Sequence, residues 1–142
     1  QPVPGLTVAR VSGRQEQALW ARTAALGTGF PNDAVEAMAR IEATLAGPQY
    51  EAQRRYIGYL GDTPVATSAL VLEPGVAGIY AVAPLPQARR KGIGTLMTQL
   101  PLLEARDLGY RVGLLQASSM GHPIYERMGF ADVCTYRHYL QS

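Results

Sequence analysis

A basic, glycine-containing turn between a strand and a helix constrains this chain more than any other feature of its sequence. Residues 89–95 read Arg-Arg-Lys-Gly-Ile-Gly-Thr, and residues 76–82 before them have the composition of a strand. Pro84 and Pro86 end that strand, because proline cannot donate a hydrogen bond to a sheet. Apolar residues at three- and four-residue spacing then predict a helix over residues 92–108. A helix N-terminus must therefore follow closely after a strand.

The chemistry of this turn favours an anionic ligand. Its two glycines let a ligand approach the backbone closely. The first N–H groups of the helix have no partners inside it, and the helix dipole attracts negative charge. Three consecutive cations occupy residues 89–91, and no acidic residue lies between Glu73 and Glu104. A nucleotide pyrophosphate fits this field, although the three charges taken alone favour a solvated loop.

Two common phosphate-binding motifs do not match the turn. The dinucleotide-binding fingerprint requires a third glycine at position 97, where this chain has Met97. The P-loop requires Gly-Lys followed by Ser or Thr, and the chain contains no such triplet. The turn must therefore be explained by another class of anion site.

The pattern along the chain predicts an α+β domain with an α/β-like second half. The expected elements are a strand at 6–11, helices at 15–26 and 33–45, a polar loop at 47–55, strands at 55–60, 65–72 and 76–82, a helix at 92–108, a strand at 112–116, a helix at 122–128 and one or two strands within 132–140. Short turns between the middle strands predict an antiparallel meander, and a βαβ unit follows. We therefore expect a mixed, mostly antiparallel central sheet of six to seven strands with helices on both faces.

Composition limits the setting and the partners. The chain has 142 residues, 47% of them hydrophobic and 17% charged, so one globular domain over residues 1–142 is expected. A net charge of +2 is too small for a nucleic-acid-binding face. No apolar stretch reaches the ~20 residues that span a bilayer, and the lone Cys134 excludes a disulfide framework or a cysteine-rich zinc site. We expect a cytoplasmic monomer or homodimer without metal, nucleic acid or membrane partners. Because the sequence begins at Gln1, a fragment of a longer chain is compatible with it.

A second motif, together with the turn, resembles the GNAT acetyltransferase superfamily. Arg89-x-x-Gly-x-Gly after a proline break resembles the family's acyl-CoA pyrophosphate loop, and residues 85–94 match a subgroup that reads Leu-Pro-x-Ala-Arg-Arg-x-Gly-Ile-Gly. Residues 125–130, Tyr-Glu-Arg-Met-Gly-Phe, resemble its Tyr-x-x-x-Gly-Phe motif. The order of the expected elements is also similar along nearly the whole chain. The resemblance implies the acyl-CoA N-acyltransferase fold and acetyl transfer from acetyl-CoA to a primary amine, on a small molecule or a peptide, in a ternary complex.

The resemblance also implies which residues contact acetyl-CoA. The pantetheine arm is assigned to Ala81, Val82 and Ala83, the pyrophosphate to Arg89, Arg90, Lys91, Gly92, Ile93, Gly94 and Thr95, and the CoA arm beyond the next strand to Ser118. The N–H near Val82 would polarise the thioester carbonyl, as an oxyanion hole does. Ser118 stands where the family often has Asn, so a weaker hydrogen bond is expected there.

By the same resemblance, Tyr125 is the catalytic residue. A phenol close to the departing thiolate could protonate it, whereas outside the motif a buried tyrosine usually belongs to the core. No general base is evident, because Tyr80 and its neighbours stand where many relatives carry a Glu. His122 is open to two readings, a base or acceptor-site residue and an exposed histidine at a helix start.

A function of another class stays open. The absent glutamate leaves a non-catalytic acyl-CoA-binding or sensing module within a longer protein as the alternative to an enzyme. Release of thiol from acetyl-CoA across a panel of amines separates the two. The sequence carries no readable code for the acceptor.

Overall fold

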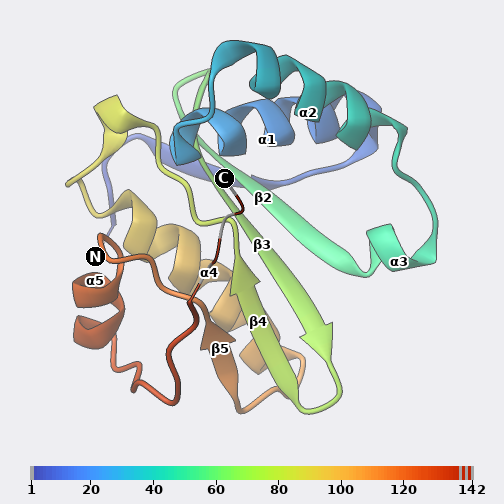
Figure 1. Cartoon of the computed structure of the whole chain (residues 1–142). Helices are drawn as coiled ribbons and strands as arrows, with labels where there is room; N and C mark the ends of the chain where they lie inside the picture. The colour runs from blue at the N-terminus through green and yellow to red at the C-terminus, as the bar shows by residue number, and fades with distance from the viewer. Residues whose placement is uncertain (1, 138, 140, 142) are drawn as a thin grey trace.

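The computed structural model describes residues 2–137, 139 and 141, and its centre is one mixed sheet (Figure 1). The strands are β1 (Leu6–Arg10), β2 (Gln53–Leu60), β3 (Thr63–Glu73), β4 (Val76–Tyr80) and β5 (Gly113–Leu115). They lie side by side in chain order, β1 to β4 antiparallel and β5 parallel to β4. The α+β class and the mixed, mostly antiparallel sheet are confirmed, but the sheet has five strands, so the expectation of six to seven was wrong.

The missing strands are those expected within residues 132–140. Residues 132–137 and 139 form no strand, and residues 138 and 140 lie outside the described part of the chain. Alternation of apolar and polar residues stabilises a strand only where one face becomes buried. Here Val133 is 93% exposed and Tyr136 and Tyr139 are also exposed, so these apolar side chains are not buried and do not stabilise a strand.

Helices cover both faces of the sheet, as expected. The helices are α1 (Gly13–Thr28), α2 (Asn32–Thr44), α3 (Pro48–Glu51), α4 (Ile93–Asp107) and α5 (His122–Arg127), with a short turn of 3-10 helix at Pro86–Ala88. Successive residues of a strand point to opposite faces. Arg54 and Tyr56 of β2 contact Glu104 of α4, whereas Arg55 between them pairs with Glu42 of α2. The two helical layers therefore lie on opposite sides of the sheet (Figure 1).

The main core lies between the sheet and α4. Leu70, Ile79, Ile93 and Met97 are almost fully buried there. Gly58 of β2 leaves room for this packing, since a Cβ at that position would lie 3.0 Å from the Met97 sulfur. α4 continues through Pro101, which is itself fully buried, so packing offsets the hydrogen bond that proline cannot donate. Among the described residues, none of the helices is both long and apolar enough to traverse a lipid bilayer.

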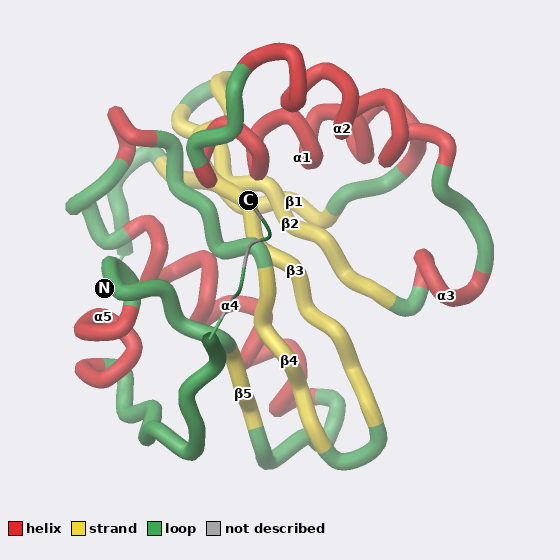
Figure 2. Tube along the Cα trace, viewed as in Figure 1, coloured by secondary structure: helices red, strands yellow, loops and turns green. Residues whose placement is uncertain are grey.

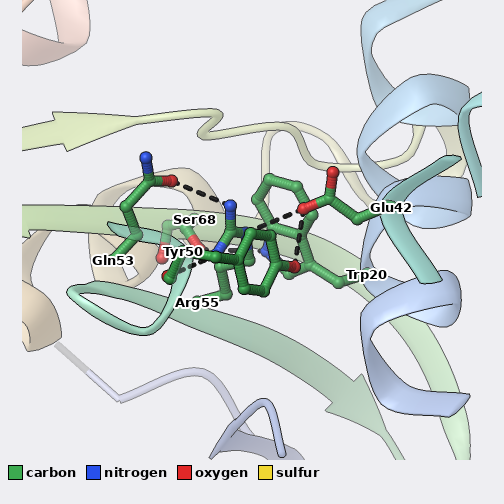
Figure 3. A network of polar contacts seen from close by, with 6 residues as sticks. All are labelled: Trp20, Glu42, Tyr50, Gln53, Arg55 and Ser68. Carbon is green, nitrogen blue, oxygen red and sulfur yellow. Dashed lines mark hydrogen bonds and ion pairs between the residues drawn. The ribbon is translucent and has the colours of Figure 1, made fainter. Parts of the chain in front are cut away.

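The other face carries a buried arginine that organises the segment after α2 (Figure 3). The Arg55 guanidinium lies 3.7 Å from the ring centre of Tyr50 and 5.1 Å from that of Trp20. It pairs with Glu42 at 3.1 Å and donates to Gln53 Oε1 at 2.8 Å. These contacts hold α3 against the sheet. The expectation of a plain polar loop over residues 47–55 was therefore wrong, because the arginine within it supplies a buried partner.

Candidate functional site

The site begins where β4 and β5 separate. Their pairing ends at Ile79 and Leu115, and beyond these residues the backbone segments that follow β4 and β5 diverge (Figure 2). β4 itself ends at Tyr80, two residues earlier than the predicted strand, because Ala81 adopts a left-handed backbone conformation with φ of 53°. Such a conformation is uncommon for a residue with a side chain. The kink turns the following backbone away from β5 and opens a gap between the strands.

One backbone donor in this gap is left free. After the kink, the N–H groups of Ala83 and Leu85 still donate to carbonyls of β3, at 3.2 and 2.8 Å. The Ala81 carbonyl accepts a hydrogen bond from the Thr67 hydroxyl at 2.8 Å. Among the described residues, the Val82 N–H has no hydrogen-bond partner. Because buried N–H groups are nearly always paired, a free donor at this place is a candidate for contact with a ligand.

A cavity of about 750 Å³ extends from this gap to the start of α4. Its lining residues are Gly27, Thr28, Val82, Ala83, Pro84, Ala88, Arg89, Arg90, Gly92, Ile93, Gly94, Thr95, Ser118, Met120, Gly121, Pro123, Ile124, Tyr125 and Arg127. The fold thus brings the predicted turn and the predicted Tyr125 to one cavity. Ala81 and Lys91, also predicted, do not line it.

The N-terminus of α4 forms the anion-binding end of the cavity. Gly92 caps the helix with φ of 81°, and Arg90 before it has φ of 63°. The N–H of Leu96 is the first to bond back into the helix, to the Gly92 carbonyl at 3.2 Å. The N–H groups of residues 92–95 have no partner among the described residues. Together with the helix dipole they can hold an anion such as a pyrophosphate.

The three cations of the turn occupy different positions. The Arg89 guanidinium donates to the carbonyl of Gly27 at 2.9 Å, so this side chain fastens the turn to the end of α1. Arg90 lines the cavity and is exposed, whereas Lys91 is exposed outside it. Arg127, which sequence reasoning missed, adds a cation from α5. The sequence could have indicated Arg127, because this residue lies two positions after Tyr125 within the Tyr-x-x-x-Gly-Phe motif.

A close contact between Gly27 of α1 and the backbone of Ala83 forms another wall of the cavity. A Cβ on Gly27 would lie 2.5 Å from the carbonyl oxygen of Ala83, closer than real Cβ atoms come. Only glycine therefore lets α1 pack directly on the segment that follows β4 (Figure 2). Sequence analysis missed this residue, since the helix predicted over residues 15–26 ends just before it, whereas α1 continues through Gly27 to Thr28.

Tyr125 lies half-buried in the cavity wall. Its ring packs edge-on against Phe130, with centroids 6.0 Å apart, and rests on Gly121, where a Cβ would be 3.0 Å from the ring. Burial raises the pKa of the phenol, while the neighbouring Thr98 hydroxyl acts in the opposite direction. The phenol is therefore protonated at neutral pH, as a proton donor must be.

Ser118 and His122 are both engaged within the protein. The Ser118 hydroxyl oxygen accepts a hydrogen bond from the Gly121 N–H at 3.1 Å, so it shapes the turn into α5 while lining the cavity. His122 does not line the cavity. Its Nε2 lies 2.8 Å from Asp132, which raises the pKa of the imidazole, and its Nδ1 lies 3.9 Å from Glu126. These three side chains could hold a metal by distance, but they lie at the surface and away from the cavity.

A comparison with protein families decides the identity. The model of the acetyltransferase (GNAT) family matches residues 22–130. The chain belongs to the GNAT acetyltransferase family. That match covers the turn, the cavity walls and the Tyr-x-x-x-Gly-Phe motif of this GNAT protein. No curated protein sequence matches the chain significantly.

Solved structures agree with the GNAT fold. A GCN5-related N-acetyltransferase from Ralstonia eutropha is 20% identical with a TM-score of 0.73, over 96% of this chain and 99% of that one. A predicted acetyltransferase from Clostridium acetobutylicum, solved with acetyl-CoA, is 19% identical with a TM-score of 0.70, over 95% of this chain and 96% of that one. Glucosamine-6-phosphate N-acetyltransferase from Arabidopsis thaliana is 12% identical with a TM-score of 0.73, over 96% and 99%. At such identities the likeness establishes the acyl-CoA N-acyltransferase fold.

Proposed function

We propose that this GNAT protein transfers an acetyl group from acetyl-CoA to a primary amine by direct attack within a ternary complex. One observation carries the proposal: a single cavity joins the free N–H of Val82, the free N–H groups at the start of α4 and the phenol of Tyr125. The similar structure from Clostridium acetobutylicum contains acetyl-CoA, and the Arabidopsis relative is by its name an N-acetyltransferase. Both facts support the same substrate pair here.

The N-terminus of α4 would hold the pyrophosphate of CoA. Its N–H groups at residues 92–95 donate, and Arg90 and Arg127 supply charge from two sides. Hydrogen bonds to a charged partner contribute about 1.5–3 kcal/mol each. Arg89 acts indirectly by holding the turn through Gly27, and Lys91 contributes only longer-range charge.

The gap between β4 and β5 would orient the acetyl group. The pantetheine arm would fit beside residues 81–83, and the Val82 N–H would donate a hydrogen bond to the carbonyl oxygen of the acetyl group. This donor strengthens its bond as negative charge develops on that oxygen, which lowers the barrier to attack. Ser118 lines the gap on the other side, with its hydroxyl hydrogen free to donate.

Tyr125 would complete the transfer. Its protonated phenol donates to the sulfur as the carbon–sulfur bond breaks, so CoA leaves as a thiol. Nucleophilic catalysis is not part of this proposal, since Cys134 lies exposed on the C-terminal segment, outside the cavity wall.

The test is product formation from acetyl-CoA across a panel of primary amines. Chromatography should quantify CoA and mass spectrometry the acetylated amine, because the exposed Cys134 would react with a colorimetric thiol reagent. We expect CoA and acetylated amine in equal amounts. Tight binding of acetyl-CoA without product from any amine would refute the proposal and favour the non-catalytic acyl-CoA-binding module.

A further inference from the structure

The sheet presents an uncovered face beside the cavity, on the side of α1. Paired residues of neighbouring strands share a face. Arg55 pairs with Ala69, and Ala69 with Tyr80, so Tyr80 lies on the face that Trp20 of α1 covers at Arg55. In the next row Gly78 pairs with Leu114. Helix α1 contacts β3 and β2, and on the β4 and β5 part of this face Tyr80 and Leu114 are partly exposed.

The open part is apolar. Tyr80 and Leu114 are each 42% exposed, and Val112, on the same face two residues before Leu114, is also exposed. The Tyr80 ring folds over Gly78, where a Cβ would come within 2.7 Å of it. The ring therefore lies next to Leu114 across the strand pair. We call Tyr80, Val112 and Leu114 the apolar floor.

The apolar floor lies near the reactive end of the cavity along the chain, although its three residues are outside the cavity lining. Tyr80 directly precedes the kink at Ala81, and the free N–H of Val82 follows it. Met120, an exposed apolar residue, lines the cavity on the β5 side. A group that attacks a carbonyl held at Val82 from this face would therefore come close to Tyr80.

The charge around this entrance is positive. The described residues that line the cavity include Arg89, Arg90 and Arg127 and no carboxylate. Strand β4 carries no acidic residue, and Glu42 on the same side of the sheet is paired with Arg55. A polycationic acceptor would therefore find no counter-ion among these groups.

We propose that the acceptor is a monoamine with an apolar group of about aromatic size, which lies on the apolar floor and attacks without a general base. The inference rests on the proposed function. Apolar surroundings disfavour an ammonium ion, so they lower the pKa of the bound amine and favour its neutral form. Its lone pair forms the new bond to the thioester carbon, and the carbon–sulfur bond breaks. The sulfur takes the Tyr125 proton, the nitrogen loses one proton to water, and the Tyr125 phenolate regains a proton from water.

The experiment compares two primary amines of opposite character, phenethylamine and the dication putrescine. Burial of a phenyl group contributes enough to predict a kcat/KM about 10- to 100-fold higher for phenethylamine. The kcat/KM for phenethylamine should also level off at a pH below the pKa of the free amine in water. A higher kcat/KM for putrescine would overturn the inference. So would a kcat/KM for phenethylamine that rises with pH until the pKa of the free amine in water.

Two variants locate the effect. Leu114→Glu places a carboxylate on the apolar floor and should lower the ratio of the two kcat/KM values at least about 10-fold. Leu108→Glu, at a leucine of similar exposure beyond the end of α4, should leave the ratio unchanged. Leu114→Gln serves if the glutamate variant does not fold, and should lower kcat/KM for phenethylamine alone.

The outcomes separate this inference from the function on which it rests. An unchanged ratio in a folded Leu114 variant would mean that another part of the chain covers the apolar floor, and would overturn the inference alone. Transfer that favours putrescine would likewise overturn only this inference, because it would still support the proposed acetyltransferase function. Binding of acetyl-CoA without transfer to either amine, or to any in the panel, refutes both.

Discussion

Gly94→Ala adds one methyl group to the second residue of α4, at the point where the helix faces the cavity. The nearest atom that this methyl would meet is Pro84 Cγ at 3.5 Å, an ordinary van der Waals distance. The protein itself therefore has room for alanine. Because alanine is favoured over glycine in a helix by up to about 1 kcal/mol, the free energy of unfolding should stay the same or rise.

The effect on CoA binding should be the opposite. Gly94 and Pro84 both line the cavity, so the methyl enters the space in which the pyrophosphate would contact the N–H groups of residues 92–95. Loss of one hydrogen bond to a charged group costs about 1.5–3 kcal/mol. At 1.4 kcal/mol for each factor of ten, the Kd for CoA should rise about 10- to 150-fold.

Two measurements on the same preparation test this prediction. Calorimetric titration gives the Kd for CoA, and urea denaturation gives the free energy of unfolding. A stable variant with weakened binding is the expected result. An unchanged Kd would refute the reasoning, because it would place the pyrophosphate away from this helix N-terminus.

Three further predictions concern other parts of the site. Tyr125→Phe should lower kcat about 100-fold or more with little change in the Kd for acetyl-CoA; an unchanged kcat would remove the proton-donor role. Gly27→Ala should lower the free energy of unfolding in urea by about 1–3 kcal/mol, because its methyl would overlap the Ala83 carbonyl; unchanged stability would contradict that contact. Asp132 raises the pKa of His122, so this pair stabilises the fold below about pH 6.5 and the gain is lost as the pH rises through the folded-state pKa. Asp132→Asn should flatten the dependence of the urea midpoint on pH, and a parallel dependence in both proteins would exclude the pair as its source.

The parts of the fold that sequence predicted well are those specified by local chemistry. α4 was expected over residues 92–108 and is found at Ile93–Asp107, because its apolar stripe and its glycine cap lie within the segment itself. The antiparallel meander followed from short turns, and the position of β5 from a short apolar run. The turn at residues 89–95 was recognisable for the same reason.

The parts that sequence reasoning could not reach depend on distant partners. The alternation in residues 132–137 predicted strands, but these residues are exposed and pair with no strand among the described residues. The sheet therefore ends at β5. Arg89 read as one of three cations aimed at an anion, yet its partner is the Gly27 carbonyl, 62 residues away in sequence. The place of Gly27 against Ala83 and of Arg55 between two aromatic rings likewise appears only when α1 packs on the sheet.

The central claim is that the cavity between β4, β5 and α4 binds acetyl-CoA with its pyrophosphate at the start of α4. Amide chemical shifts followed during a titration of the isotopically labelled protein with CoA test it most directly. The largest changes should occur at the N–H groups of residues 92–95 and of Val82, which have no partners among the described residues. Changes centred instead on the smaller cavity near Arg106 and Arg111, with residues 92–95 unaffected, would contradict the account.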